Sequence, residues 1–225
     1  MNFEQMNNNR VYIAGKVVSE PKFSYEVFGE GFYEFNLEVK RLSEISDVIP
    51  VTISERLLQG GTIELNSLIA GVGQFRSYNK MVDGKSKLML TVFIRELKEY
   101  DESINPNQIE ITGYVCKEPI YRTTPFKREI ADVLIAVNRS FNKSDYLPCI
   151  AWGRNAKFVS TLNVGDKLEM VGRIQSRAYQ KRIDENVVEN KIAYEISLNK
   201  IVKADATENS ILSESETDFG YYANI

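Results

Sequence analysis

The sequence contains no histidine and only two cysteines, Cys116 and Cys149. Without histidine the chain lacks the side chain most often used for general acid–base catalysis, and Ser–His and Cys–His nucleophiles are excluded. Two cysteines cannot complete an ordinary zinc centre, which takes about four nitrogen or sulfur ligands. Both cysteines lie in apolar, strand-like runs and are expected to be buried, reduced thiols. The composition therefore predicts a protein that is not an enzyme and holds neither a metal nor a cofactor.

Long apolar runs are also missing, since no stretch reaches the roughly 18 residues that suggest a transmembrane helix. Residues 1–10 contain neither an early basic cluster nor an apolar core, so a secretory signal is not expected. With 43% hydrophobic and 26% charged residues, the composition is that of a globular protein. These features predict a cytoplasmic protein without a membrane span.

The net charge of −3 is unevenly distributed along the chain. Residues 107–204 contain 16 basic and 11 acidic side chains, whereas residues 10–100 contain 12 of each. Residues 205–225 carry five acidic side chains and no basic one. A basic module followed by an acidic tail is typical of nucleic-acid binding, because the module needs phosphates and the tail repels them.

An internal repeat with an offset of 98 residues divides the chain. Residues 10–23 (RVYIAGKVVSEPKF) recur as residues 108–121 (QIEITGYVCKEPIY), so that Gly15 matches Gly113. Later matches at offsets of 99 and 104 indicate a one-residue insertion and then a longer hairpin in the second copy. The chain is accordingly expected to contain a first domain, a linker, a second domain and an acidic flexible tail, over residues 8–100, 101–106, 107–204 and 205–225.

Each repeat has the pattern of a small β-barrel. In the second repeat the runs that alternate apolar with polar residues or are rich in branched and aromatic residues are 109–115, 131–139, 146–152, 167–179 and 191–202. A helical stretch at 155–162 follows the third run, and residues 55–58 form a reduced counterpart in the first repeat. Five strands with one helix after the third is the order of an OB-fold barrel. The predicted fold class is therefore all-β, with two tandem OB-fold, five-stranded Greek-key barrels, each with one short helix.

The third strand of the second repeat lacks charge on both of its faces. Read with a period of two, Leu147, Cys149 and Ala151 form an inner face, whereas Tyr146 and Trp152 lie on the outer face. Aromatic rings on an open barrel face suit single-stranded nucleic acid, because bases stack on the rings while nearby cations neutralise phosphates. The cations expected around this face are Arg139, Arg154, Arg173, Arg177 and Lys181.

The same side chains also fit roles unrelated to nucleic acid. Trp152 and Ile150, which shares its face, could instead fill a dimer interface or pack under a loop, and the arginines could form a solvated surface. Phe141, just past the second strand, and Tyr179, at the end of the fourth, could extend the platform of aromatic rings.

Residues 145–179, which begin DYLPCIAWGRN, resemble the third strand, helix and fourth strand of bacterial single-stranded DNA-binding proteins (SSBs). Residues 119–124 (PIYRTT) and 133–141 (VLIAVNRSF) resemble the first two strands of that family, and the first repeat resembles it more weakly. The resemblance implies OB barrels, four of which wrap the DNA, so a chain with two barrels would assemble as a homodimer. It further implies sequence-independent binding and protection of single-stranded DNA in replication, recombination or repair, and an association with the nucleoid.

By this resemblance the family's stacking aromatics fall on Phe141, Tyr146, Trp152 and Tyr179, with Tyr121 and Arg122 as further contacts. The corresponding positions of the first repeat align with Ser43, Val48, Ser54 and Tyr78, so three of the four aromatics are missing there. The first repeat is therefore expected to serve mainly assembly, with help in DNA binding from Arg76, Tyr78 and Phe23.

The family's acidic C-terminal tail docks replication and repair proteins. Residues 205–225 are acidic but end in TDFGYYANI and lack the family's aspartate run with a Pro-Phe terminus, so partner docking and folding back onto a barrel are alternatives. A primosomal or replication adaptor that acts mainly through protein contacts is the main alternative function. The surrounding arginines disfavour an oligosaccharide-binding pair of OB folds.

Overall fold

A computed structural model describes residues 7–41, 43, 45–59, 63–82, 84–184 and 187–204, without the side chains of residues 181, 183, 184 and 187. The first half of the chain forms β1 (Asn9–Val17), β2 (Lys22–Val27), β3 (Glu30–Lys40), β4 (Ser46–Ser54), α1 (Glu55–Leu58), β5 (Leu68–Val82) and β6 (Lys85–Lys98). Along β3, Phe35, Leu37 and Val39 are buried and the residues between them are partly exposed, as the period of two predicts.

The second half repeats this order. It consists of β7 (Asn107–Val115), β8 (Ile120–Thr123), β9 (Glu129–Arg139), the 3₁₀ turn η1 (Ser140–Asn142), β10 (Lys143–Trp152), α2 (Arg154–Val159), β11 (Lys167–Asp184) and β12 (Val187–Lys203). The short strands β2 and β8 were not among the runs predicted by periodicity, although residues 119–124, which contain β8, resemble a strand of the family. Every residue of β8 is exposed, so its sequence has no apolar alternation that could have marked it as a strand.

Each half closes into a barrel. In the first, β1 pairs with β3 and β5, β3 pairs with β4, and β5 pairs with β6. A parallel pairing of β4 with β6 completes the ring. The second barrel has the same five pairings among β7, β9, β10, β12 and β11. In both barrels the helix follows the third barrel strand, as predicted.

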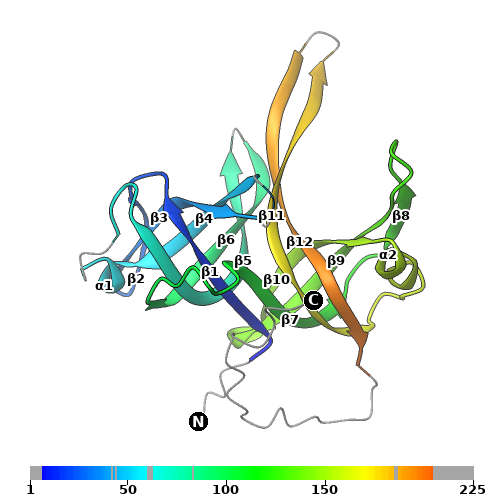
Figure 1. Cartoon of the computed structure of the whole chain (residues 1–225), viewed down its shortest axis with the longest axis horizontal. Coiled ribbons are helices and arrows are strands. Elements are labelled where there is room, and N and C mark those ends of the chain that lie inside the picture. The colour runs from blue at the N-terminus through cyan, green and yellow to red at the C-terminus, as the bar shows by residue number, and fades with distance from the viewer. Residues whose placement is uncertain are drawn as a thin grey trace.

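The two barrels lie side by side and share one twelve-stranded sheet (Figure 1). They are joined by an antiparallel pairing of β1 with β7, in which Val11 lies opposite Ile109. Asn9 lies opposite Ile111, and Asn107 lies opposite Ile13. Asn9 and Asn107 occupy the same position in the two repeats, and so do Ile13 and Ile111, so the two strands exchange equivalent contacts. An approximate two-fold axis therefore passes between Val11 and Ile109, as in an isologous dimer.

Glycines permit the close approach of strands in each barrel. β6 has a bulge opposite Gly73 of β5, where Arg95 is the extra residue, and β12 has one opposite Gly172 of β11, where Asn199 is the extra residue. A Cβ at Gly73 would collide with the carbonyl of Phe93, and a Cβ at Gly172 would collide with the carbonyl of Ser197. These two positions therefore require glycine so that the bulged strands β6 and β12 can approach β5 and β11 closely.

Neither cysteine forms a disulfide. Cys149 is buried in the core of the second barrel, and burial raises the pKa of its thiol. Cys116 is partly buried, and its thiol donates to the carbonyl of Leu134 at 3.1 Å. Both are thus reduced thiols, although only Cys149 is fully buried.

Candidate nucleic-acid interface

β10 supplies two aromatic side chains to the outer face of the second barrel. Tyr146 is 47% exposed and Trp152 is 39% exposed, and both alternate with the buried inner residues of the strand. Ile150 shares their face but is only 3% exposed, in register with Ser197 of β12. Ile150 is therefore packed within the protein, and Tyr146 and Trp152 are the accessible rings of this strand.

Phe141 and Tyr179 lie on the connections around this face. Phe141 is 82% exposed and has a φ of 62°, in the left-handed region that a bulky residue rarely adopts. Tyr179 lies on the long β11–β12 hairpin, which projects beyond the barrel (Figure 1). The guanidinium of Arg177 lies 5.9 Å from the centre of the Tyr179 ring.

Most of the predicted cations have a carboxylate partner. Arg122 pairs with Asp132 at 2.7 Å, Arg139 with Asp145 at 3.3 Å, Arg173 with Asp47 at 3.4 Å, and Arg177 with Glu195 at 3.5 Å. The exposed Arg154, at the start of α2, has no ion pair within the part of the chain that the structure describes. The side chain of Lys181 lies outside the described residues. Counting charges in the sequence therefore overstates the positive charge that is free to meet a phosphate.

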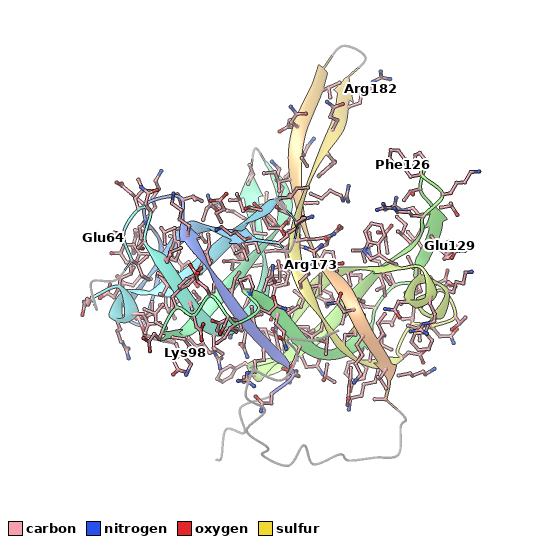
Figure 2. The ribbon with its side chains drawn as sticks, in the orientation of Figure 1. Glu64, Lys98, Phe126, Glu129, Arg173 and Arg182 are labelled. Carbon is pink, nitrogen blue, oxygen red and sulfur yellow. The ribbon has the colours of Figure 1, made fainter. Side chains whose placement is uncertain are left out.

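Asp47 links the two barrels. Its carboxylate is buried and accepts hydrogen bonds from the Ser176 backbone nitrogen at 2.7 Å, the Ser176 hydroxyl at 3.1 Å and Arg41 Nε at 2.7 Å. Arg173, which pairs with it, lies at the junction of the barrels (Figure 2). Burial opposes ionisation of Asp47, but the hydrogen bonds from Arg41 and Ser176 outweigh it, and the pKa of Asp47 lies below its usual value.

Asp145 makes the equivalent link in the opposite direction, with fewer donors. One of its oxygens accepts from the Ser77 backbone nitrogen at 2.8 Å, and the Ser77 hydroxyl accepts from the Tyr146 backbone nitrogen at 2.7 Å. The other carboxylate oxygen is buried and has no donor among the described residues. Burial raises the pKa of Asp145 above its usual value. Tyr146 is thus anchored directly beside the cross-barrel contact.

Glu195 is a part of the face that sequence reasoning missed. It is only 6% exposed and accepts from Gln175 Nε2 at 2.8 Å, while also pairing with Arg177. In the sequence Glu195 alternates with apolar residues and reads as an outward, solvated acid. Its burial depends on the pairing of β12 with β11, which places it opposite Gln175 and which no local pattern announces.

Tyr121 and Arg122 point to opposite sides of β8. Arg122 lies opposite Ile130, which in turn lies opposite Trp152, so Arg122 shares the face of Trp152. Tyr121 lies on the other side, where a hydrogen bond with Glu129 raises its pKa. Of these two predicted contacts, only Arg122 lies on the face of the aromatic platform.

None of the described helices is both long and apolar enough to cross a bilayer. Within the described ranges, no three His, Cys, Asp or Glu side chains come together as metal ligands.

Comparison with known proteins identifies the family. The model of the single-strand binding protein family matches residues 106–202, which is the second barrel. Single-stranded DNA-binding protein 1 of Streptococcus pyogenes (strain MGAS8232) is 30% identical over 122 residues, covering 51% of this chain and 93% of that protein. The chain belongs to the single-strand binding protein family.

Other members of the family are matched over less of their length. Single-stranded DNA-binding protein B of Bacillus subtilis is 33% identical over 88 residues, which cover 36% of this chain and 78% of that protein. Single-stranded DNA-binding protein 1 of Staphylococcus aureus (strain COL) is 34% identical over 83 residues, which cover 34% of this chain and half of that protein.

A solved structure confirms the fold of both halves. A deletion mutant of the single-stranded DNA binding protein from Thermus aquaticus superposes with a TM-score of 0.67 at 19% identity, covering 90% of this chain and 97% of that chain. At this identity the likeness concerns the fold alone. It confirms the prediction that the present chain contains two OB-fold barrels.

The hydrogen bonds between the barrels of this single-strand binding family member change one predicted correspondence between the two repeats, that of Tyr78 with Tyr179. Ser77 and Ser176 make the same cross-barrel bonds, so Tyr78 corresponds to Arg177 and not to Tyr179. The counterpart of Tyr179 is Lys80, two residues further along β5. The sequence alignment is misplaced here because short repeats of this kind align on a shared tyrosine, whereas the hydrogen bonds define the register.

The remaining predicted residues of the first barrel are engaged with neighbours. The Tyr78 hydroxyl is hydrogen-bonded to Glu34 at 3.0 Å, and burial together with that bond raises the pKa of Tyr78 to about 12. Phe23 is exposed and meets the ring of Tyr33 edge-on, with centres 5.8 Å apart.

Proposed function

We propose that this chain binds single-stranded DNA without sequence preference and that the second barrel provides the main contact. The observation that supports this most is the pair of half-exposed rings of Tyr146 and Trp152, on one face of β10, in a chain of the single-strand binding protein family. Phe141 and Tyr179 extend the proposed platform at its edges. Binding of this kind is non-covalent and needs no catalytic group.

Stacking would supply most of the affinity. Every base has a flat π-face, so stacking on tyrosine and tryptophan is tolerant of sequence and contributes roughly 1–3 kcal/mol per base. Phosphate contacts would come first from Arg154 and Lys181. The paired arginines Arg122 and Arg177 would contribute little, because a phosphate would first have to displace the carboxylates that they already bind.

Assembly and partners complete the proposal. Four barrels around one strand would require a homodimer, with Arg139 and Arg173 holding the two barrels of each chain in place through Asp145 and Asp47. We propose protection of exposed single strands during replication, recombination or repair as the role. Residues 205–225, the proposed docking segment for replication and repair proteins, lie outside the described residues.

The fluorescence of Trp152 tests this function, because Trp152 is the single tryptophan of the sequence. Adding oligo(dT) should strongly quench the emission, since a base stacked on the indole removes it from water and couples to its excited state. Duplex DNA of equal length should quench little. Unchanged emission under conditions where binding is verified independently would remove Trp152 from the interface. Absence of any binding to oligo(dT) would favour the adaptor function instead.

A further inference from the structure

The backbone of Tyr146 is held by the opposite barrel. β10 pairs with β9 along its whole length, but with β12 only at Cys149 and Ile150. At Tyr146 the other edge of β10 therefore has no neighbouring strand among the described residues. Ser77 of β5 takes this place, because its hydroxyl accepts a hydrogen bond from the Tyr146 backbone nitrogen at 2.7 Å. A side chain of the first barrel thus fixes the backbone of a platform residue in the second.

Ser77 is itself firmly placed. It is only 7% exposed and lies opposite Leu90 in the pairing of β5 with β6. Its backbone nitrogen donates to Asp145 Oδ1 at 2.8 Å, so Ser77 and the adjacent residues Asp145 and Tyr146 form a closed ring of two hydrogen bonds. Arg139 binds the same carboxylate oxygen at 3.3 Å. We call Ser77, Asp145 and Tyr146 the cross-barrel corner.

The equivalent corner at Asp47 lacks the bond to the following residue. There Ser176 corresponds to Ser77, and Val48 corresponds to Tyr146. The Ser176 hydroxyl donates to Asp47 at 3.1 Å, and within the described residues it makes no hydrogen bond with Val48. The serine hydroxyl therefore holds the next strand residue only at the corner where that residue is aromatic.

The cross-barrel corner depends strongly on Ser77, because one donor is missing. Arg173 pairs with Asp47 across the barrels, whereas Gln74 stands at the position of Arg173 in the first barrel. Asp145 Oδ2 is consequently buried without a hydrogen-bond partner among the described residues. The bonds of Ser77 are thus the main link between Asp145, Tyr146 and the first barrel.

Arg76 does not replace the missing donor. Its guanidinium lies 5.0 Å from the centre of the Phe93 ring, and its Nη2 donates to Gln74. Burial and the nearby Arg139 lower the pKa of Arg76 to about 10, so it remains charged at neutral pH. Within the part of the chain that the structure describes, it forms no ion pair with Asp145 or with another carboxylate.

We propose that Ser77 is a positioning residue for DNA binding, which acts through the cross-barrel corner to hold the Tyr146 ring in the orientation that a stacked base requires. This inference rests on the proposed function, and it gives the first barrel a part in binding that needs no contact with DNA. The direction of a side chain follows from its backbone, so a fixed amide limits the orientations of the ring. A ring that is already oriented loses less conformational freedom when a base stacks on it.

Double-mutant cycles on the full chain test the proposal, with the affinity for oligo(dT) as the readout. Tyr146→Leu should weaken binding by about 5- to 150-fold, as expected for one lost stacking contact. Ser77→Ala should weaken it by about 2- to 10-fold, which corresponds to the net contribution of one hydrogen bond. In the Tyr146→Leu background Ser77→Ala should have no further effect, whereas its loss should multiply with that of Trp152→Leu.

Ser176→Ala is the matched control, because it removes the same hydroxyl from the corner that has no aromatic ring. It should lower the unfolding temperature and leave the affinity for oligo(dT) unchanged. Ser77→Thr and Ser77→Val provide a second pair, which have nearly the same shape and differ in the hydroxyl. We expect the threonine variant to bind more tightly than the valine variant, and this comparison stands even where Ser77→Ala does not fold.

Wild-type affinity of Ser77→Ala, or equal affinities of the threonine and valine variants, would overturn the proposal. So would an equal loss with and without the Tyr146 ring, because Ser77 would then act on the junction of the barrels as a whole. An equal loss of affinity in Ser176→Ala would have the same meaning. Absence of oligo(dT) binding by the wild-type protein would instead refute the proposed function itself.

Discussion

Asp47 and Asp145 occupy equivalent positions in the two barrels, but their carboxylates receive different numbers of hydrogen bonds. Asp47 receives bonds from Ser176 and Arg41 on both oxygens, whereas one oxygen of Asp145 is buried without a donor among the described residues. The pKa of Asp47 is therefore lowered on folding and that of Asp145 is raised. A lowered carboxyl pKa stabilises the fold above the unfolded pKa of about 4, and this contribution is lost as the pH falls through the folded pKa. A raised carboxyl pKa, as in Asp145, instead destabilises the fold above the folded pKa, and this cost is relieved as the pH falls through the folded pKa.

Replacing these aspartates by asparagine should separate the two cases. At pH 7, Asp47→Asn is expected to lower the free energy of unfolding by about 2 kcal/mol, because bonds to a charged group contribute about 1.5–3 kcal/mol. Asp145→Asn should cost less than about 1 kcal/mol, since it removes a poorly solvated charge. Below about pH 4 the deficit of Asp47→Asn should shrink. Urea denaturation at several pH values measures this, and equal losses at pH 7 would show that the unpaired oxygen has a donor in solution.

At the scale of elements, the bulge glycines offer a direct check on the barrels. Gly172→Ala places a Cβ against the backbone of Ser197, which cannot move without disturbing β12. We expect a loss of about 1–3 kcal/mol in the free energy of unfolding, typical of overpacking. Gly31→Ala is the matched control, because its Cβ would collide with the flexible end of Glu55 and make only an ordinary contact with the ring of Tyr33. Thermal unfolding compares the two variants, and equal stability would mean that the bulge relaxes readily.

The strands show how far the sequence could predict the structure. Barrel strands such as β3 and β10 alternate strictly because one face is core, so the repeat and the alternation were enough to predict two barrels. The exposed strand β8 has no such constraint, and periodicity did not predict it. Ion pairs were also out of reach: Arg173 meets Asp47 across 126 residues, and no local pattern encodes a contact that depends on barrel docking.

At the scale of the whole molecule, the pairing of arginines limits the response to salt. If all seven predicted cations met phosphates, the slope of log affinity against log salt would be about −5 per chain, at about −0.7 per charge. With four arginines in ion pairs, the cations left are Arg76, Arg154 and Lys181, and the slope should be about −2. Titrations of oligo(dT) at several salt concentrations measure it. A slope near −5 would show that DNA displaces the internal carboxylates.

The mass of the protein in solution tests the proposed assembly. Light scattering should give about twice the 25.7 kDa of the chain, because four barrels around one strand require two chains. The measurement should be made with and without oligo(dT). A strict monomer at micromolar concentration in both conditions would mean that two barrels suffice to hold the DNA.

The pairing of β1 with β7 has a consequence for dilution. Because only residues 99–106 separate β6 from β7, the two barrels meet at an effective concentration of about millimolar or more, whatever the protein concentration in the cell. The two barrels therefore stay associated even when the cell contains few copies of the protein, whereas two separate single-barrel chains would dissociate on dilution. Each barrel can also change by mutation independently of the other. In a dimer of identical single-barrel chains, every mutation would instead appear on both sides of the two-fold axis.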